Sequence, residues 1–110
     1  MLAGHLKLNN FIVLIDYNKI SSITDTNKVV NLEPLDQKFS SFGFSSIEVD
    51  GHNVNSIYEA INNRDKDKPL ALICHTIKGK GVSFMENSPP WHAKGPSEEL
   101  EKKAFEELSE

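Results

Sequence analysis

The chain has 110 residues, which allows at most one domain with a real hydrophobic core and is short for an α/β enzyme, since these commonly need ~200 residues or more. Its net charge of −4 is modest and its lysines are scattered, so the composition excludes the basic footprint of a nucleic-acid-binding protein. No apolar run approaches the ~20 residues of a membrane span, and the N-terminus lacks the features of a signal peptide. The single cysteine, Cys74, lies among apolar neighbours, which predicts a buried, inert thiol. We therefore expect a cytoplasmic protein that binds neither nucleic acid nor membranes.

The hydrophobic pattern predicts strands that alternate with helices. The run FIVLI, residues 11–15, is continuously apolar, as in parallel strands that are covered on both faces. Helices are predicted where apolar residues recur at helical spacing, and Gly43 and Ser97 mark a helix end and a helix start. In chain order we expect the tail of a helix at 1–8, a strand at 11–16, a helix at 34–42, a strand at 45–49, a helix at 53–63, a strand at 70–75, a loop at 77–96 and an acidic helix at 97–108.

This order of elements predicts half of an open parallel α/β sheet flanked by helices. Ligands of such sheets bind outside the carboxyl ends of the strands. Two polar segments follow strand ends here, namely DYNKI at 16–20 and HTIKGKG at 75–81, so both are candidates for a site. Half a sheet should also leave an apolar edge exposed, and we expect the chain to associate with itself or with a partner.

The segment DYNKI has two interpretations. An acid and an amide two residues apart, Asp16 and Asn18, offer oxygen ligands to a hard cation such as Mg²⁺, and the backbone carbonyl of Ile20 can reach the same ion. Asp and Asn also form turns with their own backbone at the ends of strands. The residues alone leave both interpretations open.

The histidines and the glycine-rich loop are weaker candidates. His92 follows Trp91 in a proline-rich loop, where an imidazole can transfer protons near neutral pH, but it can equally be a surface or packing residue. The other three histidines have no zinc spacing, and we expect His75 to be structural. The segment KGKG lacks the ending of a phosphate-binding P-loop, which leaves Lys78 and Lys80 as candidate anion contacts in a mobile loop.

Three stretches resemble, in order and spacing, the later part of the thiamine-diphosphate-binding domain of transketolase. They are HLKLNNFIVLIDYNKI, NLEPLDQKFSSFGFSSIEVDGHNVNSIYEAI and KPLALICHTIKGKGVSFMENSPPWHAKGPSEEL. The chain is most similar to the split form, in which that domain is a separate N-terminal subunit. The resemblance implies that residues 1–110 are the C-terminal portion of this domain, with a thiamine-diphosphate-binding fold that is incomplete at the N-terminal side.

The resemblance also implies roles for individual residues. In this family a motif that starts at Gly-Asp-Gly and ends at an Asn anchors the diphosphate through Mg²⁺, and Asn18 matches that Asn. Ile20 matches the residue whose backbone carbonyl completes the metal shell, whereas Asp16 is not implied as a ligand. His92 matches a histidine that reaches the cofactor and the donor sugar, and is thus the implied catalytic residue. The family usually has Gly after this histidine, whereas here Ala93 follows.

Other parts of the family's site are absent from these residues. The chain contains no Gly-Asp-Gly, and the family's pyrimidine-binding domain has no counterpart in it. We therefore expect part of a transketolase, which moves a two-carbon ketol unit between sugar phosphates, to be inactive alone and to act as a homodimer or in a heteromer with a pyrimidine-binding subunit. Deoxyxylulose-phosphate synthase shares the scaffold, but VSFMEN and the later WH favour split transketolase. The alternative is a non-catalytic α/β remnant or partner-binding module.

Overall fold

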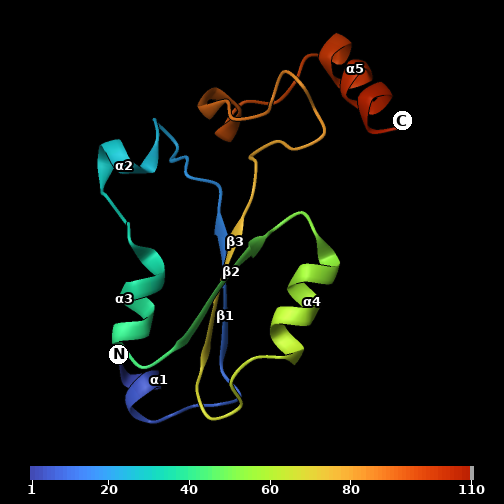
Figure 1. The fold of residues 1–110 in the computed structure, drawn as a ribbon. Coiled ribbons are helices and arrows are strands. Elements are labelled where there is room, and N and C mark those ends of the chain that lie inside the picture. The colour runs from blue at the N-terminus through green and yellow to red at the C-terminus, as the bar shows by residue number, and fades with distance from the viewer. Residues whose placement is uncertain (110) are drawn as a thin grey trace. The chain divides into compact units, whose positions relative to one another are not determined.

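The computed structural model describes residues 1–109 and divides into two compact units. The first contains Met1–Tyr17 and Leu32–Thr76, and the second contains Asn18–Asn31 and the residues from Ile77 on. The elements, which Figure 1 labels, are α1 (Leu2–His5), β1 (Ile12–Tyr17), α2 (Thr26–Val29), α3 (Leu35–Ser41), β2 (Ser45–Asp50), α4 (Val54–Asn62), β3 (Leu70–His75), a 3₁₀ helix (Pro89–His92) and α5 (Glu98–Leu108).

The sheet of the first unit is parallel, as the alternating pattern predicts. Its strand order is β1-β3-β2, with Ile12 and Ser45 both opposite Leu70. The central strand β3 is apolar along most of its length because it is covered on both sides, and Leu70 and Leu72 are completely buried. The predicted α/β fold with an open parallel sheet is therefore confirmed, and the strand boundaries agree to within one residue.

Helices α3 and α4 cover opposite faces of this sheet (Figure 1). The face under α4 holds the core, in which Leu70, Leu72 and Cys74 pack with partly buried side chains of the neighbouring elements. Those side chains are Ile12, Ile47, Val49, Ile57, Ala60 and Ile61. Cys74 is buried as predicted, and burial raises the pKa of its thiol. On the other face the ring of Phe44 packs edge-on against those of Phe11 and Phe39.

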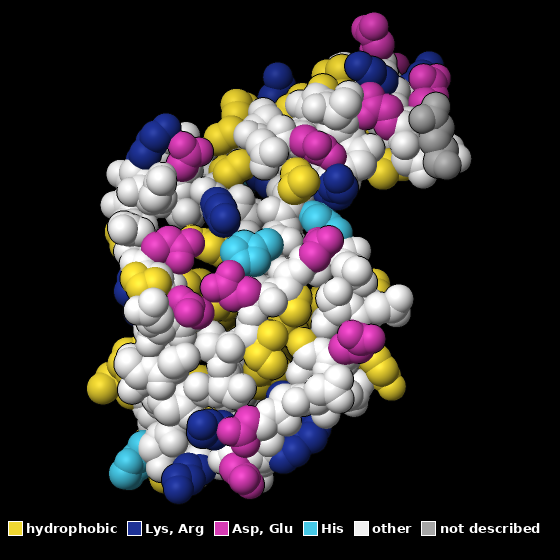
Figure 2. Space-filling view, in the orientation of Figure 1, with side chains coloured by type: hydrophobic (Ala, Val, Ile, Leu, Met, Phe, Trp, Pro, Cys, Tyr) yellow, Lys and Arg dark blue, Asp and Glu magenta, His cyan; other side chains and the backbone are white. Residues whose placement is uncertain are grey.

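The first strand is covered less than the other two. Among the elements of residues 1–109, β1 contacts only β3, and the side chains of Phe11 and Leu14 are 43% and 55% exposed. Hydrophobic side chains are visible between charged ones in the space-filling view (Figure 2). The exposure of Phe11 and Leu14 matches the exposed apolar edge that the sequence predicts.

Short helical segments depart most from the predicted elements. The helix predicted over 1–8 is reduced to α1, after which Lys7 takes a positive φ of 50°. Gly4 of α1 packs directly on the carbonyl of Phe42, where a side chain would collide. Helix α2 and the 3₁₀ helix were not predicted, because one helical turn is too short to show periodicity.

The second unit contains the predicted loop 77–96 and the predicted terminal helix. The rings of Phe84 and Trp91 pack edge-on at 5.4 Å, and the ammonium group of Lys94 lies 5.4 Å from the centre of the Trp91 ring. The backbone N–H and the hydroxyl of Ser83 both donate to the Glu107 carboxylate, which ties the loop to α5. Within residues 1–109, no helix has the length and apolar character needed to cross a membrane.

Candidate functional site

Asn18 lies one residue beyond the carboxyl end of β1 and forms a tight turn. Its Oδ1 accepts the backbone N–H of Ile20 at 2.9 Å, and Lys19 between them has a positive φ of 62°. The backbone N–H of Thr26 donates to the Lys19 carbonyl at 2.9 Å, which fixes the turn from its other side. Asn18 is therefore a turn former, as one of the two interpretations of this segment proposed.

The same turn keeps two oxygen atoms suited to a hard cation. An amide oxygen has two lone pairs, and the bond to Ile20 uses one of those on Asn18 Oδ1. Ile20 pairs with Asp25 in an isolated antiparallel bridge, but the hydrogen bonds of that bridge belong to the flanking residues, so the Ile20 carbonyl is outside the ladder. Two neutral oxygens fit Mg²⁺ if its other ligands come from water and phosphate. Residues 1–109 contain no group of three or more His, Cys, Asp or Glu side chains that could hold a metal by themselves.

Asp16, the other oxygen-bearing residue of this motif, forms a hydrogen bond across the sheet. It stands opposite Cys74 on the neighbouring strand, and its Oδ1 accepts the hydroxyl of Thr76. This contact joins the end of β1 to the residue that follows β3, at the two strand ends that the sequence singled out. Asp16 thus ties two parallel strands together at their carboxyl ends.

A second polar group at the end of β1 was missed by sequence reasoning. Tyr17 is buried, with 7% of the residue exposed, and its hydroxyl donates to Glu33 Oε1 at 2.6 Å. This hydrogen bond raises the pKa of Tyr17 to about 12. The Tyr17 ring also packs against that of His75, at 5.6 Å between centroids. Glu33 lies in a polar loop with no local signal that would have indicated this contact.

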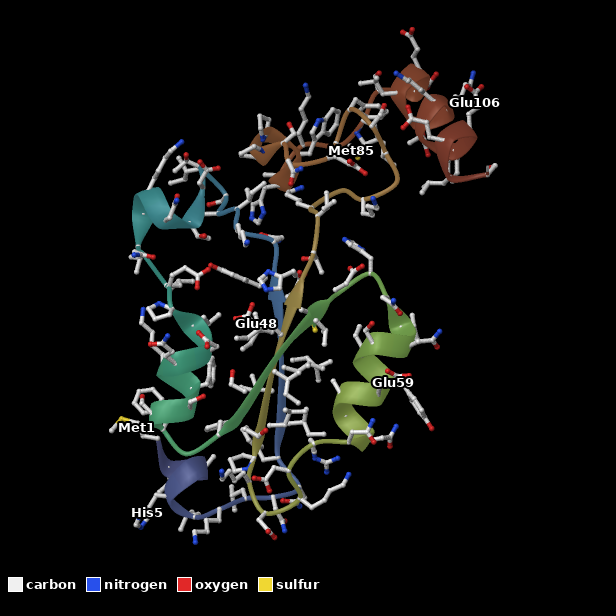
Figure 3. The ribbon with its side chains drawn as sticks, in the orientation of Figure 1. Met1, His5, Glu48, Glu59, Met85 and Glu106 are labelled. Atoms are coloured by element: carbon white, nitrogen blue, oxygen red, sulfur yellow. The ribbon has the colours of Figure 1, made fainter. Side chains whose placement is uncertain are left out.

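His75 pairs with a carboxylate of the neighbouring strand. Its Nε2 lies 2.6 Å from Oε2 of Glu48 on the neighbouring strand β2. Glu48 lies on the face of the sheet that α3 covers (Figure 3), which is also the face of Tyr17 and His75. The pair therefore links β2 to β3 beside the Tyr17 ring.

His92 is the last residue of the 3₁₀ helix and its side chain is exposed. The preceding Trp91 anchors this helix on Phe84. Asn18, Ile20 and His92 all fall in the second compact unit, although no hydrogen bond joins His92 to the Asn18 turn within residues 1–109. The exposed imidazole can donate a hydrogen bond or transfer a proton.

The glycine-rich segment folds onto its own loop. The ammonium group of Lys80 lies 4.0 Å from the Glu86 carboxylate, which also accepts the N–H of Gly81. Gly79, with a φ of 74°, packs against the backbone of Met85 so closely that a side chain would collide. Lys80 is thus partly neutralised by Glu86 and is a weaker anion contact than the sequence suggested.

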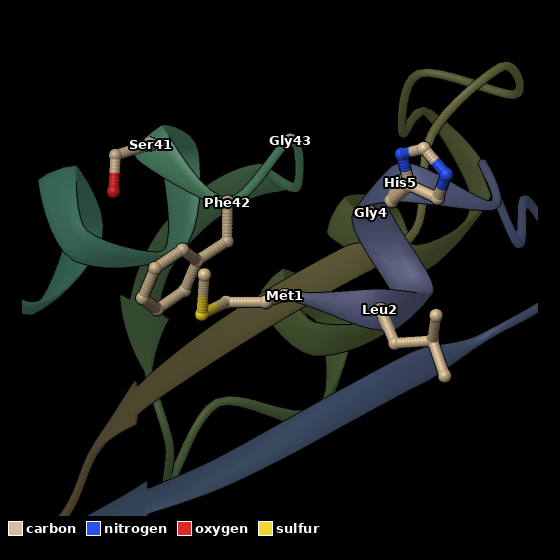
Figure 4. Close-up of a pocket in the computed structure, with 7 residues that line it drawn as sticks. All are labelled: Met1, Leu2, Gly4, His5, Ser41, Phe42 and Gly43. Carbon is tan, nitrogen blue, oxygen red and sulfur yellow. The ribbon is translucent and has the colours of Figure 1, made fainter.

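The first unit has an apolar groove of about 580 Å³ between α1 and the end of α3 (Figure 4). Met1, Leu2 and Phe42 form much of its lining, together with the close contact between Gly4 and Gly43. None of the candidate residues Asn18, Ile20 and His92 lines this groove.

Comparisons with known proteins give a consistent result. The family model described as the thiamine diphosphate binding domain of transketolase matches residues 1–104. The chain is 34% identical over 109 residues to an apulose-4-phosphate transketolase subunit of Actinobacillus succinogenes. It is 38% identical over 110 residues to the 6-deoxy-6-sulfo-D-fructose transketolase subunit SqwG of a Clostridium species. In both cases the match covers 98% of this chain and 40% of the relative, so the chain spans well under half of their length.

Solved structures agree with the sequence comparisons. The crystal structure of a transketolase from Campylobacter jejuni superimposes with a TM-score of 0.89 at 34% identity, over 98% of this chain and 17% of that one. A transketolase from Pichia stipitis superimposes with a TM-score of 0.67 at 25% identity, again over 98% of this chain.

Proposed function

The chain belongs to the family of transketolase thiamine-diphosphate-binding domains, and on this basis we propose that it is part of a transketolase that transfers a two-carbon ketol unit between sugar phosphates. The observation that carries the proposal is the match to this family over residues 1–104. Relatives whose names describe them as transketolase subunits support it further. We propose that the chain acts with a pyrimidine-binding transketolase subunit, in a heteromer or as part of a homodimer.

The proposed cofactor is thiamine diphosphate with Mg²⁺. The cofactor supplies a thiazolium that stabilises a carbanion when it is bound. In this chain Asn18 Oδ1, through its second lone pair, and the carbonyl of Ile20 would bind the Mg²⁺, because both oxygens belong to a turn that its own hydrogen bonds hold in place. The turn after β1 is thus the part of the chain that binds the metal, and its rigidity lowers the cost of ordering the two donors.

The proposed role of His92 is to contact the diphosphate or a hydroxyl of the donor sugar. A side chain that is exposed on an anchored 3₁₀ helix is available to a ligand without breaking an internal hydrogen bond. Ala93, where the family usually has glycine, keeps a small residue next to it.

Replacing His92 by alanine in the complete protein should lower ketol transfer by about 10- to 100-fold, because a hydrogen bond to a charged or reacting group is lost. Initial rates with a ketose phosphate donor and an aldose phosphate acceptor measure the effect. His5→Ala is the matched control, since His5 is exposed on α1 and is not a candidate site residue. Equal loss in both variants would contradict a specific role for His92.

The proposed function is tested by a transfer assay that compares the 110 residues alone with the complete assembly. These residues contain no Gly-Asp-Gly, so we expect no turnover from them with thiamine diphosphate, Mg²⁺ and pentose phosphates. The complete protein with its pyrimidine-binding partner should transfer ketol units. Turnover by the isolated 110 residues would contradict the expected dependence on a partner, and an inactive complete assembly would favour a non-catalytic module.

A further inference from the structure

We propose that Tyr17 and Glu33 form a positioning pair that closes the base of the segment carrying the Mg²⁺ ligands. The inference rests on the proposed function, since it concerns the binding of Mg²⁺ by Asn18 and Ile20. Neither residue of the pair is proposed to touch the metal or the cofactor. They act by holding together the two ends of the segment Asn18–Asn31.

Both partners of this hydrogen bond are held in place by further contacts. Tyr17 is the last residue of β1, and its buried ring packs against His75, which is itself held by Glu48. Glu33 accepts the Tyr17 hydroxyl at 2.6 Å through Oε1 and the backbone N–H of Leu35 at 3.2 Å through Oε2. One carboxylate therefore connects the end of β1 to the first turn of α3.

The two residues of the pair flank the segment Asn18–Asn31 in the chain, one at each end. Tyr17 directly precedes Asn18, and Glu33 lies 16 residues from Tyr17, just beyond Asn31. A bond between these residues keeps the two ends of the intervening segment together, and it reduces the number of conformations the segment can adopt. Hydrogen bonds to a carboxylate are among the stronger ones in proteins, so the segment should be closed most of the time.

Loss of the bond should therefore lower the fraction of molecules whose segment is ready to bind the metal. The apparent dissociation constant of a ligand rises in inverse proportion to that fraction, whereas a saturating ligand restores the bound state. We expect Tyr17→Phe to raise the Mg²⁺ concentration for half-maximal binding of thiamine diphosphate by about three- to tenfold. The change should appear in this concentration rather than in the turnover at saturation.

The experiment titrates Mg²⁺ into the complete protein at fixed thiamine diphosphate and follows binding by calorimetry. Tyr58→Phe is the matched control, because it removes the same hydroxyl from a side chain that is 68% exposed on α4. Glu33→Ala, which removes the acceptor, and the double variant with Tyr17→Phe complete a cycle. If the two residues act through one bond, the double variant should bind Mg²⁺ as tightly as the single variant with the lower Mg²⁺ affinity.

Limited proteolysis without metal or cofactor provides a second measurement. Lys28 lies within the segment and its side chain is 66% exposed, so trypsin should cleave after it faster in Tyr17→Phe than in the wild type. Cleavage after Lys66, in the exposed turn between α4 and β3, is the internal control and should not change. A selective increase at Lys28 supports the role, since general destabilisation would raise cleavage at both sites.

The outcomes separate this inference from the proposed function. If Asn18→Ala weakens Mg²⁺ binding but Tyr17→Phe changes neither the titration nor the cleavage at Lys28, the positioning role is overturned and the metal site stands. Equal acceleration at Lys28 and Lys66 also overturns it. If Asn18→Ala leaves Mg²⁺ binding unchanged, the metal site is overturned and the positioning role with it.

Discussion

Replacing Asn18 by alanine in the complete protein is expected to weaken Mg²⁺-dependent binding of thiamine diphosphate by about 10- to 100-fold, because a direct oxygen ligand of the metal is lost. The Ile20 ligand is a backbone carbonyl, so Ile20→Ala should have little effect. Lys19→Ala should be nearly silent, since the exposed Lys19 side chain is not a proposed ligand. The measurement is a titration of cofactor into each variant at fixed Mg²⁺.

A control is needed because Asn18 also shapes the turn through its bond to the Ile20 N–H. Ser21→Ala removes hydrogen bonds from the next turn of the same segment, in which the Ser21 hydroxyl donates to the Thr24 carbonyl at 2.6 Å and accepts the Thr24 N–H at 3.1 Å. If the loss in Asn18→Ala came only from a distorted segment, Ser21→Ala should lose a similar amount. Equal cofactor affinity in Asn18→Ala and wild type would mean that the segment is only a turn.

Replacing Leu72 by alanine is expected to destabilise the first unit by ~2 to 5 kcal/mol, since it removes a completely buried side chain from the central strand and leaves a cavity. For a chain of this size that loss corresponds to a fall of ~10 °C or more in the midpoint of thermal unfolding. Far-ultraviolet circular dichroism of the 110-residue chain during heating measures it.

Leu14 provides the matched control for this substitution. It stands directly opposite Leu72 on β1, but its side chain is 55% exposed, so Leu14→Ala should cost less than ~1 kcal/mol in the same chain. A similar loss of stability in both variants would contradict the assignment of the core to the central strand β3 rather than to the edge strand β1.

The polar turn that carries the candidate metal ligands could be located from the sequence because it depends on short-range features, whereas the choice of Asn18 and Ile20 over Asp16 as ligands came from the family resemblance. Asn18 and Ile20 follow a buried strand within the five residues of the motif DYNKI, and a parallel sheet places strand ends at one edge. His92 was located only through resemblance to a family, since a histidine in a proline-rich loop has no spacing that indicates its role. That His92 falls in the same compact unit as Asn18 is visible only in the structure.

The sequence by itself determined the three strands, the helices α3, α4 and α5, and the parallel arrangement, because these depend on local patterns: the apolar run of β1, the buried run of β3, the helical spacing of α4 and the cap at Ser97. Only the tertiary structure decided the side-chain partners at the end of the sheet. Asp16 and Thr76 are 60 residues apart and Tyr17 and Glu33 are 16 apart, so their contacts exist only because β1 lies beside β3 and the loop before α3 returns to the end of β1. Hydrophobic periodicity shows which face of a strand is buried, but it carries no information on which polar side chains meet across neighbouring strands.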